Sequence, residues 1–369
     1  MGDHKVRFLL TILFVVIGIV AFAYSMTNLL SAGKGWQEIE VDSSEGTSCS
    51  EDFVLLYDIG AGEESANAEA KKLKAAYTDL MITAYEDFHT QESFDDVTNL
   101  YSINQHPNEV LTVDDCLYQA LEEVSAAGDR KIYLGPVYAT YDDIFYCEED
   151  SQVAEFDPAT NQEMADYYQE IADFANDPES VNVELLGKNQ VKLTLSEEYE
   201  AFAKENGITH FLDFSWMTNA FITDYVAESL TDQGFTHGSI SSYDGFSRNF
   251  DDRTEVSYQY NRYQLNGSTI EALSDYEYSG RRSFVNLRIY QLSDQDQIHY
   301  YETKDGRVLT LYLDPADGCC KHAANELYAT SKEAGCGEIL LAVSPYFIAD
   351  QWDDKAGAKL EKAGIELLE

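Results

Sequence analysis

The chain has 369 residues, with 67 Asp and Glu against 24 Lys and Arg, and therefore a formal net charge of −43 at pH 7. Hydrophobic residues make up 44% of the sequence, enough for one large core or two modest ones, which excludes a globally disordered protein. Such an acidic surface repels phosphate backbones, so we expect no nucleic-acid partner. With only 22 Gly and 6 Pro, a collagen-like protein is excluded as well.

The N-terminal segment predicts a membrane anchor. Residues 8–24 form an unbroken run without a charge, and a bilayer span needs roughly 20 apolar residues. Basic residues precede the run, which predicts that residues 1–7 are cytoplasmic and that the body of the chain is extracytoplasmic. A cleaved signal peptide, with a small-x-small site at 21–23, is the alternative. The length of the run favours an uncleaved single-pass anchor over residues 8–30, and thus a location at the cell membrane.

All six cysteines lie after this segment. An even number in an exported chain permits disulfides, but the spacing matches no small disulfide scaffold. Cys319, Cys320, His322 and Cys336 can be drawn as a metal site. The chain contains no CxxC pair, however, and packing is the more common role of such residues, so we favour packing.

Residues 31–50 are rich in Gly, Ser and Glu, which predicts a linker. Apolar spacing then predicts regular elements along the chain. We expect a buried strand at 54–57, helices at 64–90, 115–126 and 160–177, a strand at 190–195, and a helix over 197–206 that ends at Gly207.

In the second half we expect a strand ending at 211–213, a helix at 218–233 and a strand opening at 239–241. Residues 254–313 alternate apolar and polar positions, with turns at 266–267 and 305–306, and predict a β-rich stretch. A helix at 321–334, a strand at 338–343 and a helix at 351–363 complete the pattern. This succession predicts an α+β (mixed α/β) fold in a single large domain over residues 51–369.

Residues 211–246 resemble the central signature of the ApbE-type FAD:protein FMN transferases. In that family a strand ends in Asp, a Gly-rich turn and Ala-Lys-Gly follow, and another Asp lies on the next helix. Asp213 and Asp224 fall at this spacing. The helix, turn and strand that join the family's two motifs are similar to residues 227–240.

Two later segments extend the resemblance. Residues 312–318 (Tyr-Leu-Asp-Pro-Ala-Asp-Gly) are similar to the family's Ile-Asp-Pro-x-Thr-Gly turn. Residues 349–350 (Ala-Asp) resemble the Ala-Asp-x-x-x-Thr element, which in the family follows a strand, opens a helix and holds the metal. With weaker matches before residue 211, the resemblance covers roughly residues 45–369 in the family's order.

The resemblance implies a single ApbE-type, T-fold-like domain and a specific activity. That activity is Mg²⁺-dependent transfer of FMN from FAD to a Ser or Thr of an exported or membrane flavoprotein, with AMP as the leaving group. FAD is then a substrate, Mg²⁺ a cofactor, and the acceptor flavoprotein a partner. In such phosphoryl transfers, positioning and charge neutralisation supply most of the catalysis.

The resemblance also assigns roles to residues. It implies catalytic roles for Asp224 and Asp314, and flavin-binding roles for Asp213, Asn219, Asp224 and Asp244. It implies that Asp350 and Asp354 hold the metal, as carboxylates spaced i, i+4 near the start of one helix.

The chain departs from the family pattern in the central signature. Ser215 and Trp216 stand where the family has a Gly-Gly turn, and Asn219 and Ala220 replace its Lys-Gly pair. These changes remove a positively charged side chain, and they add side chains where glycines would let the backbone approach a dinucleotide closely. We favour an active transferase; the alternative is a catalytically degenerate relative that binds a protein partner or cations. A purely solvating acidic ectodomain would explain the charge but not the motifs.

Overall fold

The computed structural model describes residues 33–42, 46–62, 65–296 and 298–368. The expected cytoplasmic segment 1–7 and membrane anchor 8–30 lie outside these residues. Within the described part of the chain, no helix combines the length and apolar character needed to cross a membrane.

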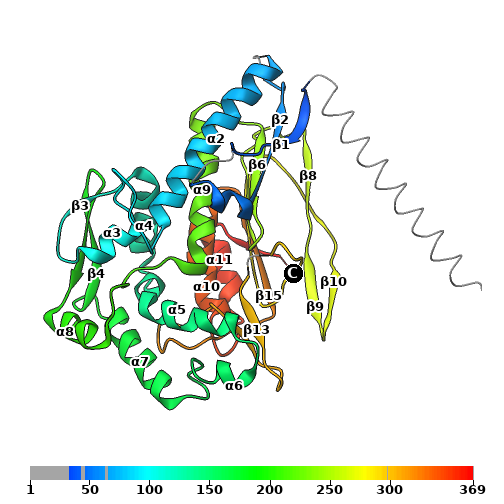
Figure 1. Cartoon of the computed structure of the whole chain (residues 1–369). Helices are drawn as coiled ribbons and strands as arrows, with labels where there is room; N and C mark the ends of the chain where they lie inside the picture. The colour runs from blue at the N-terminus through cyan, green and yellow to red at the C-terminus, as the bar shows by residue number, and fades with distance from the viewer. Residues whose placement is uncertain (1–32, 43–45, 63–64, 297, 369) are drawn as a thin grey trace, which may run out of the picture.

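A seven-stranded, fully antiparallel sheet forms the centre of the domain (Figure 1). Its strands, in spatial order, are β1 (Gly35–Glu38), β2 (Phe53–Ile59), β6 (Gly238–Ser242), β7 (Phe246–Asn249), β12 (Arg282–Arg288), β15 (Glu326–Ser331) and β16 (Glu366–Leu367). Every residue of β12 is buried, because this strand is covered on both faces.

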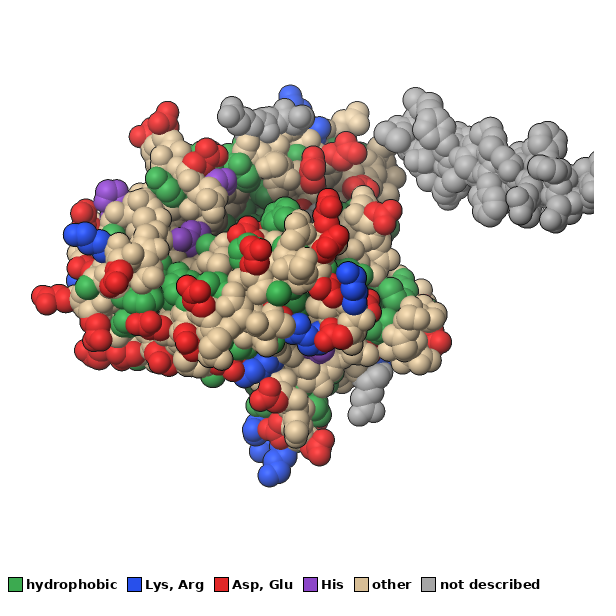
Figure 2. Space-filling view, turned by 60° about the horizontal axis from the view of Figure 1, so that its bottom comes forward, with side chains coloured by type: hydrophobic (Ala, Val, Ile, Leu, Met, Phe, Trp, Pro, Cys, Tyr) green, Lys and Arg blue, Asp and Glu red, His purple; other side chains and the backbone are tan. Residues whose placement is uncertain are grey.

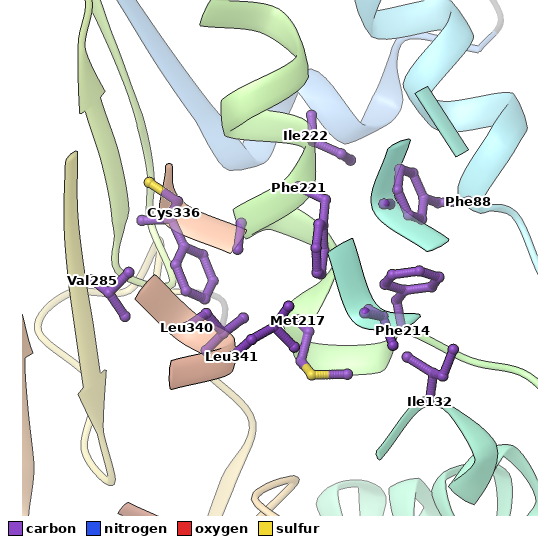
Figure 3. Packing of buried hydrophobic residues seen from close by; sticks show 14 of the residues in the cluster. Phe88, Ile132, Phe214, Met217, Phe221, Ile222, Val285, Cys336, Leu340 and Leu341 are labelled. Atoms are coloured by element: carbon purple, nitrogen blue, oxygen red, sulfur yellow. The ribbon is translucent and has the colours of Figure 1, made fainter. Parts of the chain in front are cut away.

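Three long helices cover one face of the sheet: α2 (Ala66–Phe88), α9 (Thr218–Asp232) and α10 (Cys336–Phe347). In α2 the buried positions Leu73, Tyr77, Leu80 and Met81 recur at helical spacing and form the face that packs inward. Figure 3 shows part of the resulting core, in which Cys336 and Leu340 of α10 lie between Val285 of β12 and Phe221 of α9. The predicted helix at 64–90 is confirmed.

A tyrosine-rich ribbon covers the opposite face. Its strands are β8 (Ser257–Tyr260), β9 (Tyr263–Asn266), β10 (Thr269–Ala272) and β11 (Tyr276–Ser279). Tyr260 stacks on Phe284 of β12, with ring centroids 4.1 Å apart and an interplanar angle of 5°, and Tyr263 receives the Tyr328 hydroxyl at its carbonyl. The predicted β-rich stretch is therefore confirmed, and these tyrosines serve cross-strand and face-to-face packing.

The remaining helices, strands and turns complete the domain (Figure 1). They are the helices α3 (Leu100–Gln105), α4 (Asp115–Ala127), α5 (Gly135–Tyr141), α6 (Asp150–Val153), α7 (Gln162–Asn176), α8 (Glu197–Asn206) and α11 (Ala356–Lys362), the small sheet β3 (Leu111–Thr112), β5 (Gln190–Leu195), β4 (Val181–Gly187), and the hairpin β13 (Tyr300–Glu302), β14 (Val308–Thr310). Short 3₁₀ turns lie at η1 (Ser48–Asp52), η2 (Lys131–Leu134), η3 (Asp142–Tyr146) and η4 (Ser215–Met217). The expected helices at 115–126, 160–177 and 197–206 and the strand at 190–195 are confirmed, and so is the α+β class in a single domain.

The expected strand ending at Asp213 is not formed. Residues 211–213 have no regular secondary structure, and a side chain holds their backbone instead of a neighbouring strand. Asn104 Oδ1 is buried and accepts the backbone N–H groups of Phe211 and Leu212, at 2.9 and 2.8 Å. The amide group of Asn104 also donates to the Leu212 carbonyl at 2.9 Å. A buried amide thus satisfies backbone groups that a sheet would otherwise satisfy.

The C-terminal predictions at 321–334 and 338–343 are wrong, because helix and strand are exchanged there. Residues 326–331 form β15, and residues 336–347 form helix α10. Eight of the twelve residues of α10 are buried, and the helix packs against the sheet and the helices α4 and α9. A short apolar run of this kind carries no periodicity that separates a buried helix from a buried strand. The final helix begins at Ala356, later than expected.

Among the described residues, regular structure begins before residue 51. Residues 35–38, within the stretch expected to be a linker, form β1 and pair with β2 at the edge of the sheet. Trp36 of this strand packs edge-on against Tyr258 of the ribbon, with centroids 5.9 Å apart. β1 therefore links the sheet edge to the tyrosine-rich ribbon.

Candidate functional site

A cleft of about 650 Å³ opens where α2, α5, the start of α9 and the turn between β6 and β7 come together. Its carboxylate and imidazole side chains come from four aspartates and three histidines: Asp52, Asp142, Asp213, Asp244, His89, His210 and His299. Among the described residues that line it there is neither Lys nor Arg. The cleft shares the acidic character of the outer surface, where Figure 2 shows Asp and Glu side chains spread over one face.

One wall of the cleft is the turn that leads into α9. The Asp213 carboxylate accepts the Ser215 backbone N–H at Oδ1, 2.6 Å away, and Oδ2 lies 2.9 Å from His210 Nε2. Ser215 has φ of +48°, a left-handed conformation that strains most side chains and that a glycine adopts freely. The backbone at Ser215 therefore has a conformation that favours glycine, the residue that the resembled motif has at this position.

A second cluster joins the start of α9 to the β6–β7 turn. Asn219 Nδ2 donates to Asp244 Oδ2 at 3.0 Å, and the Asp52 carbonyl receives the Tyr243 N–H at 2.9 Å. Asp244 Oδ1 is buried and has no hydrogen-bond partner among the described residues. Burial raises the pKa of Asp244 to about 6, with the Asp52 charge adding to the shift. Burial likewise raises the pKa of Asp52.

The turn after Asp244 depends on a glycine. Gly245 has φ of +116°, and a Cβ at this position would collide with the Asn286 carbonyl oxygen. We expect Gly245→Ala to destabilise the protein by about 1–2 kcal/mol more than Gly267→Ala. Gly267 is the matched control, because it also has positive φ (+63°) but a Cβ there would meet no described atom within 4 Å. Urea unfolding of both variants measures the difference, and equal losses would show that the contact with Asn286 relaxes without effect.

Asp224 does not line the cleft. Its side chain is 7% exposed and pairs with Arg248 Nη1 at 2.7 Å. Its two oxygens also accept the backbone N–H groups of Cys336 and Gly337, both at 2.8 Å. The carboxylate therefore satisfies the N-terminus of α10, and its contacts are those of a structural residue.

Asp314 also lies outside the cleft. Its carboxylate pairs with Lys321 Nζ at 2.8 Å, and the same ammonium group reaches Asp317 at 2.6 Å. Asp314 and Asp350 line one shallow surface groove together with Arg130. The positive charge that pairs with the Asp314 carboxylate is thus the ammonium group of Lys321.

The expected helix face with Asp350 and Asp354 is not formed. Both residues are exposed and lie in the turn between α10 and α11, before α11 begins at Ala356. The place where a strand does lead into a helix is the junction of β15 and α10, which carries Gly335, Cys336 and Gly337. The carboxylates of this junction are those of Glu333 and Glu338, and both residues are exposed.

Across the described residues, no three His, Cys, Asp or Glu side chains gather as metal ligands. The cysteines drawn above as a metal site serve packing instead. Cys336 is buried and its thiol contacts the Ser247 carbonyl at 3.4 Å, whereas Cys320 contacts Thr310.

Of the predicted flavin-binding residues, the cleft brings Asp213, Asn219 and Asp244 together, and it adds residues that sequence reasoning missed. These are Asp52, Asp142, His210 and His299, the last paired with Asp142 at 3.1 Å. His210 could have been found from the sequence, because it precedes the predicted site residue Asp213 by only three residues. Asp52 could not, because its neighbour Tyr243 is distant in sequence.

No family model matches the sequence, and neither does any curated protein. Solved structures do match. The ApbE protein from Thermotoga maritima aligns over 90% of this chain and 93% of its own, with a TM-score of 0.59 and 13% identity. Flavin transferase ApbE from Vibrio cholerae aligns over 91% and 93%, with a TM-score of 0.60 and 13% identity. The apo flavinyl transferase ApbE of Pseudomonas stutzeri covers 85% of each chain, with a TM-score of 0.50 and 12% identity. The resemblance in the sequence is therefore confirmed at the level of the fold: this chain has the fold of the ApbE flavin transferases.

Proposed function

We propose that the protein transfers FMN from FAD to a Ser or Thr hydroxyl of an acceptor protein. The observation that carries the proposal is the convergence of Asp213, Asn219 and Asp244 in one cleft of an ApbE fold. These residues come from the two motifs in which the sequence resembles the family. Apolar and aromatic side chains, among them Trp216 and Tyr312, complete the lining and suit a flavin ring.

The reaction exchanges the phosphoanhydride bond of FAD for a phosphate ester at the same phosphorus. The acceptor oxygen attacks the FMN phosphorus, the bond from that phosphorus to the AMP oxygen breaks, and AMP leaves. Such a transfer depends on holding the two reactants in line and on neutralising the phosphate charge.

The cleft on its own opposes an anionic ligand, because its described lining holds four aspartates and no Lys or Arg. A divalent cation would reverse this. Mg²⁺ is commonly held by one or two carboxylates together with substrate phosphates, and the unpartnered Asp244 Oδ1 beside Asp52 fits that donor set. Asp52 and Asp244 would hold the ion, which supplies charge neutralisation at the phosphates. The exposed Asp350 and Asp354 do not fit it.

We expect FAD to bind the purified domain (residues 33–369) at least about tenfold more tightly with Mg²⁺ than with EDTA, since each tenfold step corresponds to about 1.4 kcal/mol. Flavin fluorescence measures the binding, and chromatography measures the AMP released. In Asp244→Asn the Mg²⁺ effect is expected to shrink severalfold. Asp143→Asn is the control, because Asp143 is exposed and does not line the cleft, yet the change in charge is the same. FAD binding that ignores Mg²⁺ would contradict the proposed ion site, and no binding at high micromolar FAD would contradict the function.

A second candidate function uses the same cleft without chemistry. The strained Ser215 and the adjacent Trp216 stand where the family has glycines, which favours a relative that binds a ligand or cation and has lost transfer. FAD binding without AMP release would support this alternative.

We propose further that residues 8–30 anchor the protein in the membrane and that the acceptor is an exported or membrane flavoprotein. Membrane fractionation of the full chain tests the anchor.

A further inference from the structure

We propose that His210 is the general base of the transfer and that Asp213 is its positioning residue. This inference rests on the proposed function. It adds the group that removes the proton from the attacking hydroxyl, a role that none of the residues predicted from the sequence fills.

The two side chains form a hydrogen-bonded pair on the wall of the cleft. His210 Nε2 and Asp213 Oδ2 are 2.9 Å apart, and the side chains are 15% and 20% exposed. When Nε2 carries the proton and donates it to the carboxylate, the lone pair at Nδ1 is available to accept another. No described residue occupies Nδ1 of His210 with a hydrogen bond. A His oriented by a carboxylate, with its second nitrogen open, is the arrangement that activates hydroxyl nucleophiles.

The pair is held on both sides. Asp213 uses its other oxygen for the Ser215 N–H at 2.6 Å, so the carboxylate cannot turn away from the imidazole. The backbone of the segment 210–213 is fixed by Asn104 and by the close approach of Gly135, where a Cβ would lie 2.8 Å from the His210 carbonyl oxygen. The imidazole is therefore positioned before any ligand arrives.

The other two histidines of the cleft are less suited to the role. His299 pairs with Asp142 at 3.1 Å, but the side chains are 43% and 37% exposed, so water weakens their interaction. His89 Nδ1 already accepts the backbone N–H groups of Gln91 and Glu92, both at 3.2 Å. His210 alone among the three combines low exposure, a fixed carboxylate partner and an open ring nitrogen.

The step balances without another reactant. The hydroxyl proton of the acceptor Ser or Thr, or of water, moves to His210 Nδ1 as its oxygen attacks the FMN phosphorus. The electron pair of the broken bond leaves with the AMP oxygen. Asp213, whose Oδ2 lies 2.9 Å from His210 Nε2, stabilises the imidazolium that forms. The proton then passes to solvent.

The test uses FAD, Mg²⁺ and water as the acceptor, with AMP release as the readout. For His210→Gln we expect kcat to fall by about 10²–10⁴-fold, with the FAD Kd within about twofold of wild type. The acidic limb of the pH–rate profile is expected to disappear. His106→Gln is the control, because His106 is an exposed histidine outside the cleft that also has an acidic neighbour, Glu109, at 3.9 Å. It should leave kcat and the profile unchanged.

Asp213→Asn is the second variant, and it separates positioning from folding. We expect it to keep the cooperative unfolding transition and the FAD Kd while kcat falls by at least about tenfold, because an amide no longer fixes the Nε2–H tautomer of the imidazole. A purely structural role for Asp213 would lower stability and leave kcat of the folded variant unchanged.

The outcomes are distinct. If wild type releases AMP and His210→Gln releases it at the same rate, the role of His210 is overturned while the proposed function stands. If the folded variant is slow, binds FAD normally and has lost the acidic limb, the inference is supported. If wild type binds FAD and releases no AMP, the transferase function fails, and the role of His210 fails with it.

Discussion

Asp224→Ala is expected to lower the free energy of unfolding by about 3–5 kcal/mol, the range found when one partner of a buried ion pair is removed. The carboxylate binds Arg248 at 2.7 Å and accepts two backbone N–H groups at the start of α10. Its loss leaves a largely buried guanidinium with one exposed partner and leaves both N–H groups without an acceptor. Urea unfolding followed by far-UV circular dichroism measures the loss.

Glu228→Ala is the matched control. Glu228 contacts the same Arg248 nitrogen at 2.9 Å, but its side chain is 56% exposed and caps no helix. An exposed ion pair of this kind contributes about 0–1 kcal/mol. If both variants lose stability equally, Asp224 does not have the structural role assigned to it. FAD binding by the folded Asp224→Asn variant should match wild type, since the residue lies outside the cleft.

Asp87→Asn is expected to remove a pH dependence of stability. Asp87 lies on α2, is fully buried, and accepts no hydrogen bond of ordinary geometry from any described residue. Burial, with the Asp114 charge second, raises the pKa of Asp87 to about 8. The ordinary pKa of an unfolded Asp is about 3.9, so between roughly pH 4 and 8 the folded state binds the proton more tightly than the unfolded state does. This group therefore makes stability fall as pH rises through that window, with a slope of up to about 1.4 kcal/mol per pH unit.

The amide of Asn cannot ionise, so the variant should gain stability relative to wild type as pH rises, and most at pH 8. The measurement is the free energy of unfolding from urea titrations at several pH values between 5 and 9. Asp79→Asn serves as the control, because Asp79 is an exposed residue of the same helix. Parallel curves for wild type and Asp87→Asn would mean that Asp87 is ionised at neutral pH in the folded protein.

Much of the fold follows from local patterns. Helix α2 has its buried residues at helical spacing, and α8 ends at Gly207, which has the left-handed φ of a helix terminus. The ribbon alternates burial along its strands β8 and β11. The exchange of helix and strand near the C-terminus came from segments buried on all sides, for which the contacts around the chain decide the conformation.

The site was predictable in part. The motif resemblance led to Asp213, Asn219 and Asp244, which do meet in one cleft. It also led to Asp350 and Asp354, and that prediction failed. An i, i+4 spacing places two residues on a shared face only where a helix exists, and α11 begins after both of them. Asp52 could not be found in this way, since its place beside Tyr243 depends on the pairing of β2 with β6.

That pairing has a consequence for how the protein folds. β2 pairs with β6, so Phe53 finds its partner Ser242 only after the intervening chain has been made. The strand β16, at residues 366–367, pairs with β15 later still. Contacts between residues so distant in sequence slow folding, because long loops must close before the contacts form. The cleft draws its walls from Cys49 to Tyr312, so no early fragment on the ribosome holds a complete binding site. β16 can pair with β15 only after residue 367 has been synthesised, and until then the edge of β15 stays open to wrong partners.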